Sequence, residues 1–423
     1  MIDEKRIINN PEEVRAELLK RGFEVDFTEY IEQKELRNSL LLKIEEIRAR
    51  RNKLSKSIGE YKREKKDTTA LFEEIDAIKD AIVADEETLK ETERSIEEFL
   101  YKIPNIPDSD LVLGDKEYNE VVSVNKTKPE FDFPIKDHVD LATSLGLIDY
   151  ERAAKISGKG TWIYSGLGAR FEWALLNFFV DEHLKDGYEF MMLPHILNYE
   201  SGLTAGQFPK FQDEVFWLEG EEPRKFILPT AETALINIHR NEILKPEELP
   251  RKYFGYTPCY RKEAGSYRSE ERGMIRGYQF NKVEMVQFTT KEDSDKAFEE
   301  LLMKAESLMK KLGLHYQVSK LAAGDVSFAM ARTFDIEVWL PSIGIYKEVS
   351  SVSNSRDFQA RRGLIRYRTA DDQIEYCHTL NGSGLATSRL LPAILEQNQQ
   401  ADGSVLVPEV LVPYLGGIKV LKK

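Results

Sequence analysis

The chain has 423 residues, enough for two or three domains with a sizeable hydrophobic core. Charged residues make up 31% of it and the formal net charge is −13, which excludes a globally basic nucleic-acid-binding protein, so any RNA contact has to come from a local basic surface. Two cysteines are too few for a disulfide framework, and no apolar run approaches the ~18 residues of a membrane span.

The N-terminal segment predicts a short helix and no signal peptide. The first residues, MIDEKRIINN, lack the apolar core of a secretion signal, so we expect a cytoplasmic protein. Asn10 can cap a helix, Pro11 suits its first position, and two glutamates follow in the first turn. We predict that this helix runs to about Arg21 and ends before Gly22.

A long charged region from Thr28 to Tyr101 contains one glycine and no proline. Heptad spacing recurs on both sides of a break at Lys65–Thr69, at Leu40, Ile44, Ile47, Arg51, Leu54, Ile58 and Tyr61, and then at Ile75, Ile78, Ile82, Asp85, Leu89, Thr92, Ile96 and Phe99. Two heptad helices joined by a tight turn predict an antiparallel coiled-coil hairpin over about residues 28–100. Each helix would be roughly 50 Å long.

Charge divides the predicted hairpin. Residues 43–66 contain ten Lys or Arg against four Glu, whereas residues 67–100 contain twelve acidic residues against three basic ones. A basic ribbon on an acidic protein suits contact with phosphates. The charges alone fit equally an interhelical salt-bridge lattice or a dimerisation arm.

A proline-punctuated linker, Ile103–Asp110, separates the hairpin from the rest of the chain. Beyond it, Asp137–Tyr150 and Phe171–Leu184 are predicted helices, and Glu189–Pro194 is predicted to begin a strand-rich body. No zinc-type Cys/His cluster is present in the sequence.

Residues 259–288 predict two strands joined by a polar loop, Ala264–Gly273. Period-two alternation puts one set of side chains on a single face of the second strand: Arg276, Tyr278, Phe280, Lys282 and Glu284. About 13 Å separates Phe280 from Glu284, so this face has room for a nucleotide at one end and an amine at the other. The alternative is an amphipathic hairpin with a solvated face.

Three further stretches carry polar groups whose roles the residues alone leave open. Thr230 and Glu232, in Leu-Pro-Thr-Ala-Glu, stand at the start of a predicted helix, Glu232–His239, where they suit a helix cap or a ligand. Glu348 and Ser351 offer the hard oxygen ligands that Mg²⁺ accepts. Asn381-Gly-Ser-Gly-Leu-Ala-Thr-Ser-Arg389 follows a predicted strand, Glu375–Leu380, as a glycine-rich turn into a helix.

These stretches together resemble the motifs of class II aminoacyl-tRNA synthetases. Arg261-x-Glu263 with Arg276, Phe280 and Glu284 resembles motif 2 (about 253–288), and Asn381–Arg389 resembles motif 3 (about 375–400). Thr-Ala-Glu, Glu-Val-Ser-Ser and the region around Glu189–Pro194, which resembles motif 1, follow the order of the seryl-tRNA synthetase family over nearly the whole chain.

The resemblance implies an α+β fold with an N-terminal antiparallel coiled-coil arm and a catalytic domain built on an antiparallel β-sheet flanked by helices. It implies a tRNA-binding domain at residues 1–103, a linker at 104–115 and a catalytic domain at 116–423. The implied activity is ATP-dependent attachment of serine to tRNA(Ser), with tRNA(Sec) as a second candidate substrate, Mg²⁺ as the metal and a homodimer as the assembly. Neither DNA nor a membrane is an expected partner.

Residue roles also follow from the resemblance. Arg261 and Arg389 are the expected catalytic residues. The expected serine ligands are Thr230, Ala231, Glu232, Arg261, Glu284, Asn381 and Ser383. The expected ATP ligands are Arg261, Lys262, Glu263, Gly277, Phe280, Glu348, Val349, Ser350, Ser351 and Arg389, with Glu348 and Ser351 also holding Mg²⁺. The expected tRNA contacts are Arg50, Arg51, Lys53 and Lys56.

Some positions depart from the family's usual pattern. Tyr278 stands where histidine is usual, Tyr267–Arg272 replaces the commoner loop sequence, and Ser388 replaces a frequent glycine. Pro392 is expected to kink the motif 3 helix or to mark its first turn. Two other functions stay open: a paralogue that charges a small amino acid onto a carrier protein, which would lack the arm, and a non-enzymatic RNA-binding descendant, which would have lost ATP ligands.

Overall fold

The computed structural model describes residues 1–263 and 272–423, and the chain divides into two compact units. The arm unit comprises Ile2–Arg15 and Glu24–Ile103, and the body unit comprises Met1, Ala16–Phe23 and Pro104–Lys423. Two short helices, α1 (Glu4–Asn9) and α2 (Pro11–Leu19), lie near the N-terminus. The prediction placed α2 correctly, with Pro11 as its first residue, but missed α1.

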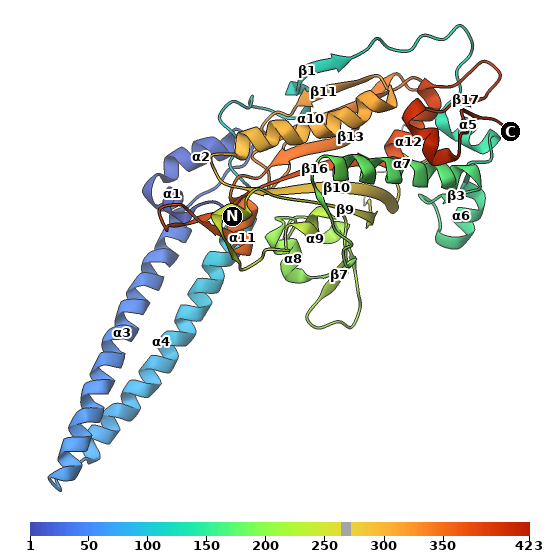
Figure 1. Ribbon diagram of the computed structural model, residues 1–423. Helices are drawn as coiled ribbons and strands as arrows, with labels where there is room; N and C mark the ends of the chain where they lie inside the picture. Colours follow the sequence, from blue (N-terminus) through green and yellow to red (C-terminus); the bar gives the residue numbers. More distant parts are fainter. Residues whose placement is uncertain (264–271) are drawn as a thin grey trace. The chain divides into compact units, whose positions relative to one another are not determined.

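The arm unit is an antiparallel helical hairpin of α3 (Thr28–Arg63) and α4 (Thr69–Lys102) (Figure 1). The predicted coiled coil is therefore confirmed, including its break. The apolar heptad positions that are buried are Leu40, Ile44, Ile58, Ile75, Ile78, Ile82 and Ile96. Near the open end of the hairpin, Tyr30 stacks on Phe99 with ring centroids 5.3 Å apart, so aromatic packing closes the two helices there.

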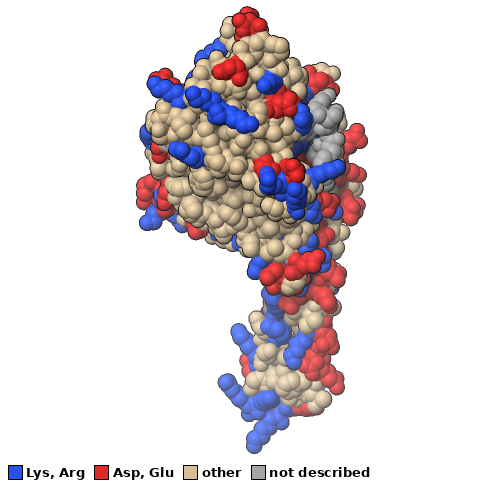
Figure 2. All heavy atoms as spheres, turned by 90° about the vertical axis from the view of Figure 1, so that its right-hand side faces the viewer, with Lys and Arg blue, Asp and Glu red and all other residues tan. Residues whose placement is uncertain are grey.

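Ion pairs link the basic helix to the acidic one. Arg37 pairs with Glu93 at 2.9 Å, and Lys43 pairs with the buried Asp85 at 2.7 Å. Arg50, an expected tRNA contact, pairs with Glu74. The salt-bridge interpretation thus holds for part of the ribbon, whereas Arg51, Lys53 and Lys56 form no ion pair with any residue that the structure describes. Figure 2 shows further Lys and Arg side chains gathered at the hairpin tip.

The body unit is built on an eight-stranded sheet with the order β1-β11-β12-β13-β16-β10-β9-β4. Neighbouring strands are antiparallel except for β4 and β9, which are parallel. The strands are β1 (Glu120–Asn125), β11 (Tyr316–Lys320), β12 (Arg332–Leu340), β13 (Ile345–Asn354), β16 (His378–Ala386), β10 (Gln279–Thr289), β9 (Arg251–Tyr260) and β4 (Glu189–Phe190). The predicted fold class is confirmed.

Three helices cover one face of this sheet: α7 (Leu167–Lys185), α10 (Ser294–Leu312) and α12 (Thr387–Gln397) (Figure 1). The core between the layers contains buried side chains from both, among them Phe171, Phe179, Val283, Met285, Leu301, Val352 and Leu391. Gly382 of β16 lets Leu301 of α10 approach closely, since an added Cβ would lie 3.1 Å from the Leu301 side chain.

Shorter elements surround the opposite face and the ends of the sheet. They are α5 (His138–Ser144), β2 (Ile148–Asp149), α6 (Tyr150–Ser157), β3 (Ile163–Tyr164), β5 (Ile196–Asn198), α8 (Tyr199–Thr204), β6 (Phe216–Trp217), β7 (Lys225–Ile227), α9 (Glu232–Leu235), β8 (Ile243–Leu244), α11 (Phe358–Gly363), β14 (Arg366–Arg368), β15 (Ile374–Tyr376), β17 (Val405–Leu406) and β18 (Val420–Leu421). None of the described helices is both long and apolar enough to cross a membrane.

Several predicted boundaries are wrong. The predicted helix Asp137–Tyr150 ends at Ser144, because Gly146 takes a left-handed φ of +68° after it. The second motif 2 strand begins at Gln279, so Arg276 and Tyr278 precede it. The helix that was expected to reach His239 stops at Leu235.

The motif 3 region also differs from its prediction. The expected strand Glu375–Leu380 is two strands, and the second, β16, continues to Ala386, so Asn381 and Ser383 lie within a strand. Pro392 lies inside α12 and not in its first turn. Residues 264–271 of the motif 2 loop lie outside the described residues, so the predicted loop stays a prediction there.

The segment after the arm is bound to the body by hydrogen bonds. Asn105 Nδ2 donates to the carbonyls of Ala329 and Ser355 at 3.0 and 2.8 Å, and Asp108 pairs with Arg356 at 2.7 Å. Arg21 donates to carbonyls of the same region, including that of Ser327 at 3.0 Å. These contacts fix the loop at 326–330, part of which lines the cavity described below.

We predict that Gly168→Ala lowers the free energy of unfolding of the body by about 1–3 kcal/mol. A Cβ at Gly168, in α7, would collide with the backbone carbonyl of Leu147, which has no flexible end to move away. Gly59→Ala in α3 is the matched control, since its Cβ meets nothing within 4 Å and alanine favours a helix by roughly 1 kcal/mol. Urea unfolding of both variants tests this; a Gly168→Ala protein as stable as the wild type would contradict the packing described here.

Candidate active site

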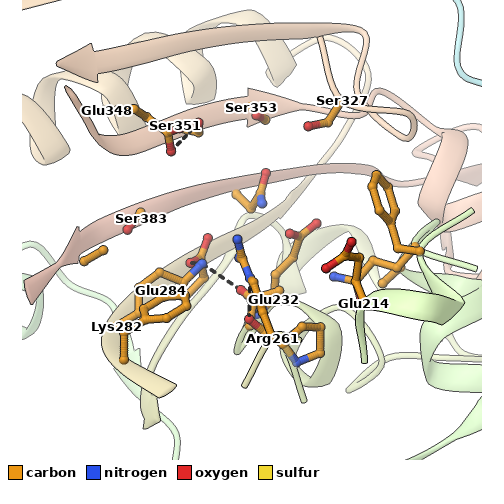
Figure 3. A pocket seen from close by; sticks show the side chains of 18 of the residues that line it. Glu214, Glu232, Arg261, Lys282, Glu284, Ser327, Glu348, Ser351, Ser353 and Ser383 are labelled. Atoms are coloured by element: carbon orange, nitrogen blue, oxygen red, sulfur yellow. Dashed lines mark hydrogen bonds and ion pairs between the residues drawn. The ribbon is translucent and has the colours of Figure 1, made fainter. Parts of the chain in front are cut away.

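A cavity of about 570 Å³ opens on the sheet face opposite α7, α10 and α12 (Figure 3). Most residues expected to bind serine or ATP line it: Thr230, Glu232, Arg261, Glu263, Gly277, Phe280, Glu284, Glu348, Val349, Ser351, Asn381, Ser383 and Arg389. Ala231, Lys262 and Ser350 do not line it. The structure therefore brings together residues that lie up to about 160 positions apart in the chain, from strands β10, β13 and β16, helices α9 and α12, the turn after β7 and the segments between β9 and β10.

Two β-bulges set which side chains face this cavity. Glu348 and Ser351 are three residues apart, a spacing that regular alternation would put on opposite faces. The β12–β13 register shifts between Ile336 and Glu337, so both side chains reach the cavity. Ser350 instead donates its hydroxyl to the carbonyl of Ser383 at 2.6 Å. A second register shift, where β10 meets β16, lies beside Lys282 and Glu284.

One end of the cavity has the chemistry of an amino-acid site. Glu284 and Glu232 are both buried, and Lys282 Nζ lies 2.5 Å from Glu284 Oε2 and donates to Thr230 Oγ1 at 2.8 Å. Gln359 Nε2 donates to Glu232 Oε1 at 2.8 Å. Asn381 Oδ1 and Ser383 Oγ are buried and have no hydrogen-bond partner among the described residues. This end therefore offers carboxylates, a cation and unpaired polar atoms to a small polar ligand.

Burial and the neighbouring charge of Glu284 raise the pKa of Glu232 from its ordinary 4.5 to about 7. The hydrogen bond from Gln359 and the charges of Lys282 and Arg261 act in the opposite direction and are weaker. Glu232 thus changes its charge near neutral pH, which is unusual for a carboxyl group and typical of a functional site.

The other end suits a nucleotide. The guanidinium of Arg261 lies 5.2 Å from the centroid of the Phe280 ring, and its Nε donates to the carbonyl of Pro229 at 3.2 Å. Arg276 Nη1 donates to Glu263 Oε2 at 2.9 Å. An aromatic face beside an arginine suits a flat base joined to a phosphate. Gly277 is required here, because a Cβ would lie 2.7 Å from the carbonyl oxygen of Gly160 and would also meet the Trp162 ring.

Glu348, Ser351 and Arg389 form a third group on the opposite wall. Arg389 Nη1 donates to the Glu348 carbonyl at 2.9 Å and lies 3.4 Å from its carboxylate. Burial acts to raise the pKa of Glu348, but the cations Arg389 and Arg261 outweigh it and lower that pKa. Burial and the Glu348 charge raise the pKa of Asp335 well above its usual range.

The same group fits a magnesium site. Ser351 Oγ donates its hydrogen to Asp335 Oδ1 at 2.5 Å, which leaves its lone pairs for a cation beside the Glu348 carboxylate. Mg²⁺ binds to proteins through one or two carboxylates together with substrate phosphates and waters. Among the described residues no group of three His, Cys, Asp or Glu could hold a metal ion alone, so phosphate oxygens would have to complete the ligand set.

Sequence reasoning missed several residues of this site. Lys282 was placed on the correct face of β10 but was given no role. Asp335 meets Ser351 only through the pairing of β12 with β13, and Gln359 reaches Glu232 from α11. No spacing in the sequence signals these contacts, because each depends on how distant elements pack.

Glu172 of α7 connects the elements that carry motif 2 and motif 3. Its Oε1 accepts hydrogen bonds from Asn281 Nδ2 at 2.7 Å and from Thr387 Oγ1 at 2.5 Å. Asn281 lies between Phe280 and Lys282 in β10, and Thr387 begins the helix that carries Arg389. Burial raises the pKa of Glu172 to about 7. This carboxyl group therefore ties both ends of the cavity to the helix layer.

Comparison with known proteins identifies the class first. Residues 216–398 match the tRNA synthetase class II core domain (G, H, P, S and T). Prolyl-tRNA synthetase of Giardia lamblia, solved with prolyl-adenylate, shares the fold alone, with a TM-score of 0.57 and 17% identity over 65% of this chain and 55% of that one. The body is thus a class II aminoacyl-tRNA synthetase core.

More similar proteins narrow the class to one family. Residues 1–107 match the seryl-tRNA synthetase N-terminal domain. The chain is 56% identical to serine–tRNA ligase 2 of Clostridium acetobutylicum over 99% of this chain and 100% of that one, and 45% identical to serine–tRNA ligase of Desulforapulum autotrophicum over 99% and 98%. Seryl-tRNA synthetase of Pyrococcus horikoshii, solved with ATP, has a TM-score of 0.90 and 32% identity over 100% and 99%. The chain belongs to the seryl-tRNA synthetase family, as the sequence motifs predicted.

We predict that Glu232→Gln stabilises the protein above neutral pH. Because the pKa of Glu232 is about 7 in the folded state and 4.5 ordinarily, the folded chain binds more protons than the unfolded chain between these values, and stability falls as pH rises through this window. Glutamine cannot ionise and still accepts the hydrogen bond from Gln359. The variant should gain about 1–3 kcal/mol at pH 8 and nothing at pH 4.5.

Urea unfolding of wild type and variant at several pH values measures this difference. The exposed Glu247→Gln controls for the loss of one carboxyl group. A Glu232→Gln difference that stays constant from pH 4.5 to pH 8 would show that Glu232 does not titrate in this window.

Proposed function

We propose that this chain is a serine–tRNA ligase that activates L-serine with ATP to seryl-adenylate and pyrophosphate and then transfers serine to the 3′ end of tRNA(Ser). One observation carries the proposal: a single cavity joins a carboxylate-lined end that suits a small amino acid to an aromatic–arginine end that suits a nucleotide. Membership of the seryl-tRNA synthetase family and the match of residues 1–107 to its N-terminal domain support the same activity.

At the serine end, Glu284 accepts the substrate ammonium and Glu232 accepts the hydroxyl, with Thr230, Asn381 and Ser383 beside them. A site built to hydrogen-bond a hydroxyl leaves its own buried groups unpaired when that hydroxyl is missing. Asn381 Oδ1 and Ser383 Oγ are buried polar atoms in this cavity that have no hydrogen-bond partner among the described residues, as a site for a polar ligand requires.

At the nucleotide end, the Phe280 ring stacks on the adenine, where stacking supplies about 1–3 kcal/mol, and Glu263 takes the adenine edge. Arg261 lies between the two ends and holds both the serine carboxylate and the α-phosphate. Arg389 binds the γ-phosphate, for which it exchanges its present contact with the Glu348 carbonyl. Glu348 and Ser351 hold Mg²⁺, which neutralises charge on the triphosphate when it is bound.

Activation needs little acid–base chemistry. A carboxylate oxygen of serine attacks the α-phosphorus, the bond from that phosphorus to the bridging oxygen breaks, and pyrophosphate leaves with the electron pair. Arg261 and Arg389 stabilise the developing charge at the two sides of the triphosphate. Holding serine and ATP in one cavity supplies the proximity that the reaction requires. A terminal ribose hydroxyl of the tRNA then takes the seryl group and releases AMP.

The arm is the proposed tRNA-binding element, through Arg51, Lys53 and Lys56 and, once released from Glu74, Arg50. We assign tRNA binding to residues 1–103, the connection to 104–115 and catalysis to 116–423. Two copies are proposed to form a homodimer through the region of α7 and β4, where Trp173 and Met192 are exposed. tRNA(Sec) is a proposed second RNA substrate.

Amino-acid-dependent ATP–pyrophosphate exchange tests the proposed function directly. Serine should drive exchange, and alanine should be disfavoured by ~10⁴–10⁵ in kcat/KM. Exchange that another amino acid drives better than serine, or no exchange at all, would overturn the assignment.

Arg389→Ala should lower the rate of adenylate formation by about 10²–10³, because it removes a charge aimed at the triphosphate, and should leave the serine KM nearly unchanged. Arg368→Ala, at an exposed arginine of β14 outside the cavity, is the control for the loss of an arginine and should have wild-type exchange. Unchanged exchange in Arg389→Ala would mean that another cation binds the γ-phosphate.

Reversing Arg51, Lys53 and Lys56 to glutamate should weaken tRNA binding and reduce the slope of log K against log salt by about 2–3, since each neutralised phosphate releases roughly one counterion. Pyrophosphate exchange should stay unchanged. Reversing Lys79, Lys90 and Arg94 makes the same charge change on α4 and should affect binding far less. Equal losses for the two triple variants would show that net charge, and not the α3 ribbon, binds the RNA.

A further inference from the structure

Lys282 is a buried cation in the wall of the cavity, between two of the proposed serine ligands. It lies two residues before Glu284 in β10, so both side chains are on the cavity face of the strand, and Lys282 is 9% exposed. Its Nζ donates to Thr230 Oγ1 at 2.8 Å and lies 2.5 Å from Glu284 Oε2. Figure 3 shows Lys282 and Glu284 side by side, with Glu232 and Arg261 next to them.

The hydrogen-bonding capacity of these groups is not exhausted by their mutual contacts. A lysine ammonium has three N–H donors, and Lys282 donates one of them to Thr230, whereas its contact with Glu284 Oε2 is an ion pair without a hydrogen bond among the described residues. A carboxylate has about four acceptor positions, so Glu284 can bind Lys282 at Oε2 and still accept a second ammonium. N–H donors of Lys282 beyond the one on Thr230, and part of Glu284, are therefore available to a ligand.

Lys282 also supplies positive charge that the carboxylate of a bound amino acid would need at this end of the cavity. A free amino acid is a zwitterion, and its ammonium and carboxylate each need an opposite charge when they leave water. Glu284 and Glu232 supply the anions, while Arg261 is shared with the α-phosphate and already donates to the Pro229 carbonyl. Lys282 is the cation that lies beside the ammonium site itself.

A purely structural role explains the position poorly. A buried ion pair recovers its desolvation cost only with good geometry and full hydrogen bonding, and apolar residues of similar size usually stabilise a core as well or better. The pair of Lys282 with Glu284 lies at a cavity wall, next to a buried Thr230 hydroxyl, and not in the apolar layer between sheet and helices.

We propose that Lys282 is a serine-positioning residue that holds Glu284 and Thr230 in their binding orientation and directs a further N–H to the carboxylate of the bound serine. The inference rests on the proposed function, because it takes serine as the ligand of this end of the cavity. It adds a second cation to Arg261 at the carboxylate that attacks the α-phosphorus.

Lys282→Met tests the proposal, since methionine has a similar length and lacks the charge and the donors. The comparison ligand is L-serinamide, which keeps the ammonium and the hydroxyl of serine but has no carboxylate. Serine KM and the serinamide inhibition constant are measured in serine-dependent pyrophosphate exchange, together with the ATP KM and the unfolding midpoint. Lys252→Met is the matched control, because Lys252 also pairs with a glutamate, Glu300 at 2.7 Å, on the neighbouring strand β9.

We expect Lys282→Met to raise the serine KM by about 30-fold or more. The serinamide inhibition constant should rise at least ~10-fold less than the serine KM, because serinamide has no carboxylate for Lys282 to bind. The ATP KM should stay within about twofold of the wild-type value. Lys252→Met should change none of these. Lys282→Arg keeps a charge and N–H donors, so it should restore much of the wild-type preference for serine over serinamide. This result separates loss of the carboxylate contact from damage to the fold.

The outcomes are distinct. If the wild-type enzyme is active and Lys282→Met weakens serine and serinamide binding equally, or weakens neither, the proposed role of Lys282 is wrong while the proposed function stands. Wild-type protein that shows no serine-dependent exchange overturns the proposed function and this inference with it.

Discussion

The alternation of side chains along β10 is the constraint on which the rest of the structure depends. Val283 and Met285 point into the apolar layer beneath the helices, and this forces Lys282 and Glu284 onto the opposite face. A shift of one residue in the pairing with β9 or β16 would bury the two charges in the core. Because that shift is so costly, the hydrophobic core fixes the positions of the charged side chains to which we assign serine binding.

The buried carboxylates of the cavity are largely compensated by the positive charges of neighbouring lysine and arginine side chains, but not completely. Burial and the charge of Glu284 raise the pKa of Glu232 to about 7. Lys282, Arg261 and Arg389 balance the remaining carboxylates, and Glu172 anchors β10 and α12 from the helix layer. Such strained electrostatics are expected of a site shaped for a ligand and not for stability.

Sequence reasoning recovered what depends on local pattern or motif and missed what depends on packing. The arm followed from heptads such as Ile75, Ile78 and Ile82, which need only a helical period. Ser350 and Ser351 were both expected beside ATP, but the register shift between β12 and β13 lets Ser351 line the cavity whereas Ser350 does not. Asp335 and Gln359 are invisible to spacing, because strand pairing and the docking of α11 bring them to the site.

The central claim is that one cavity holds serine at Glu284 and the nucleotide at Phe280. A crystal structure of the chain with a seryl sulfamoyl adenosine, an unreactive analogue of seryl-adenylate, tests it most directly. We expect the ammonium of the analogue within hydrogen-bond distance of Glu284, its hydroxyl at Glu232, its sulfamoyl group beside Arg261 and its adenine stacked on Phe280. An analogue bound in the reverse orientation, or outside this cavity, would contradict it.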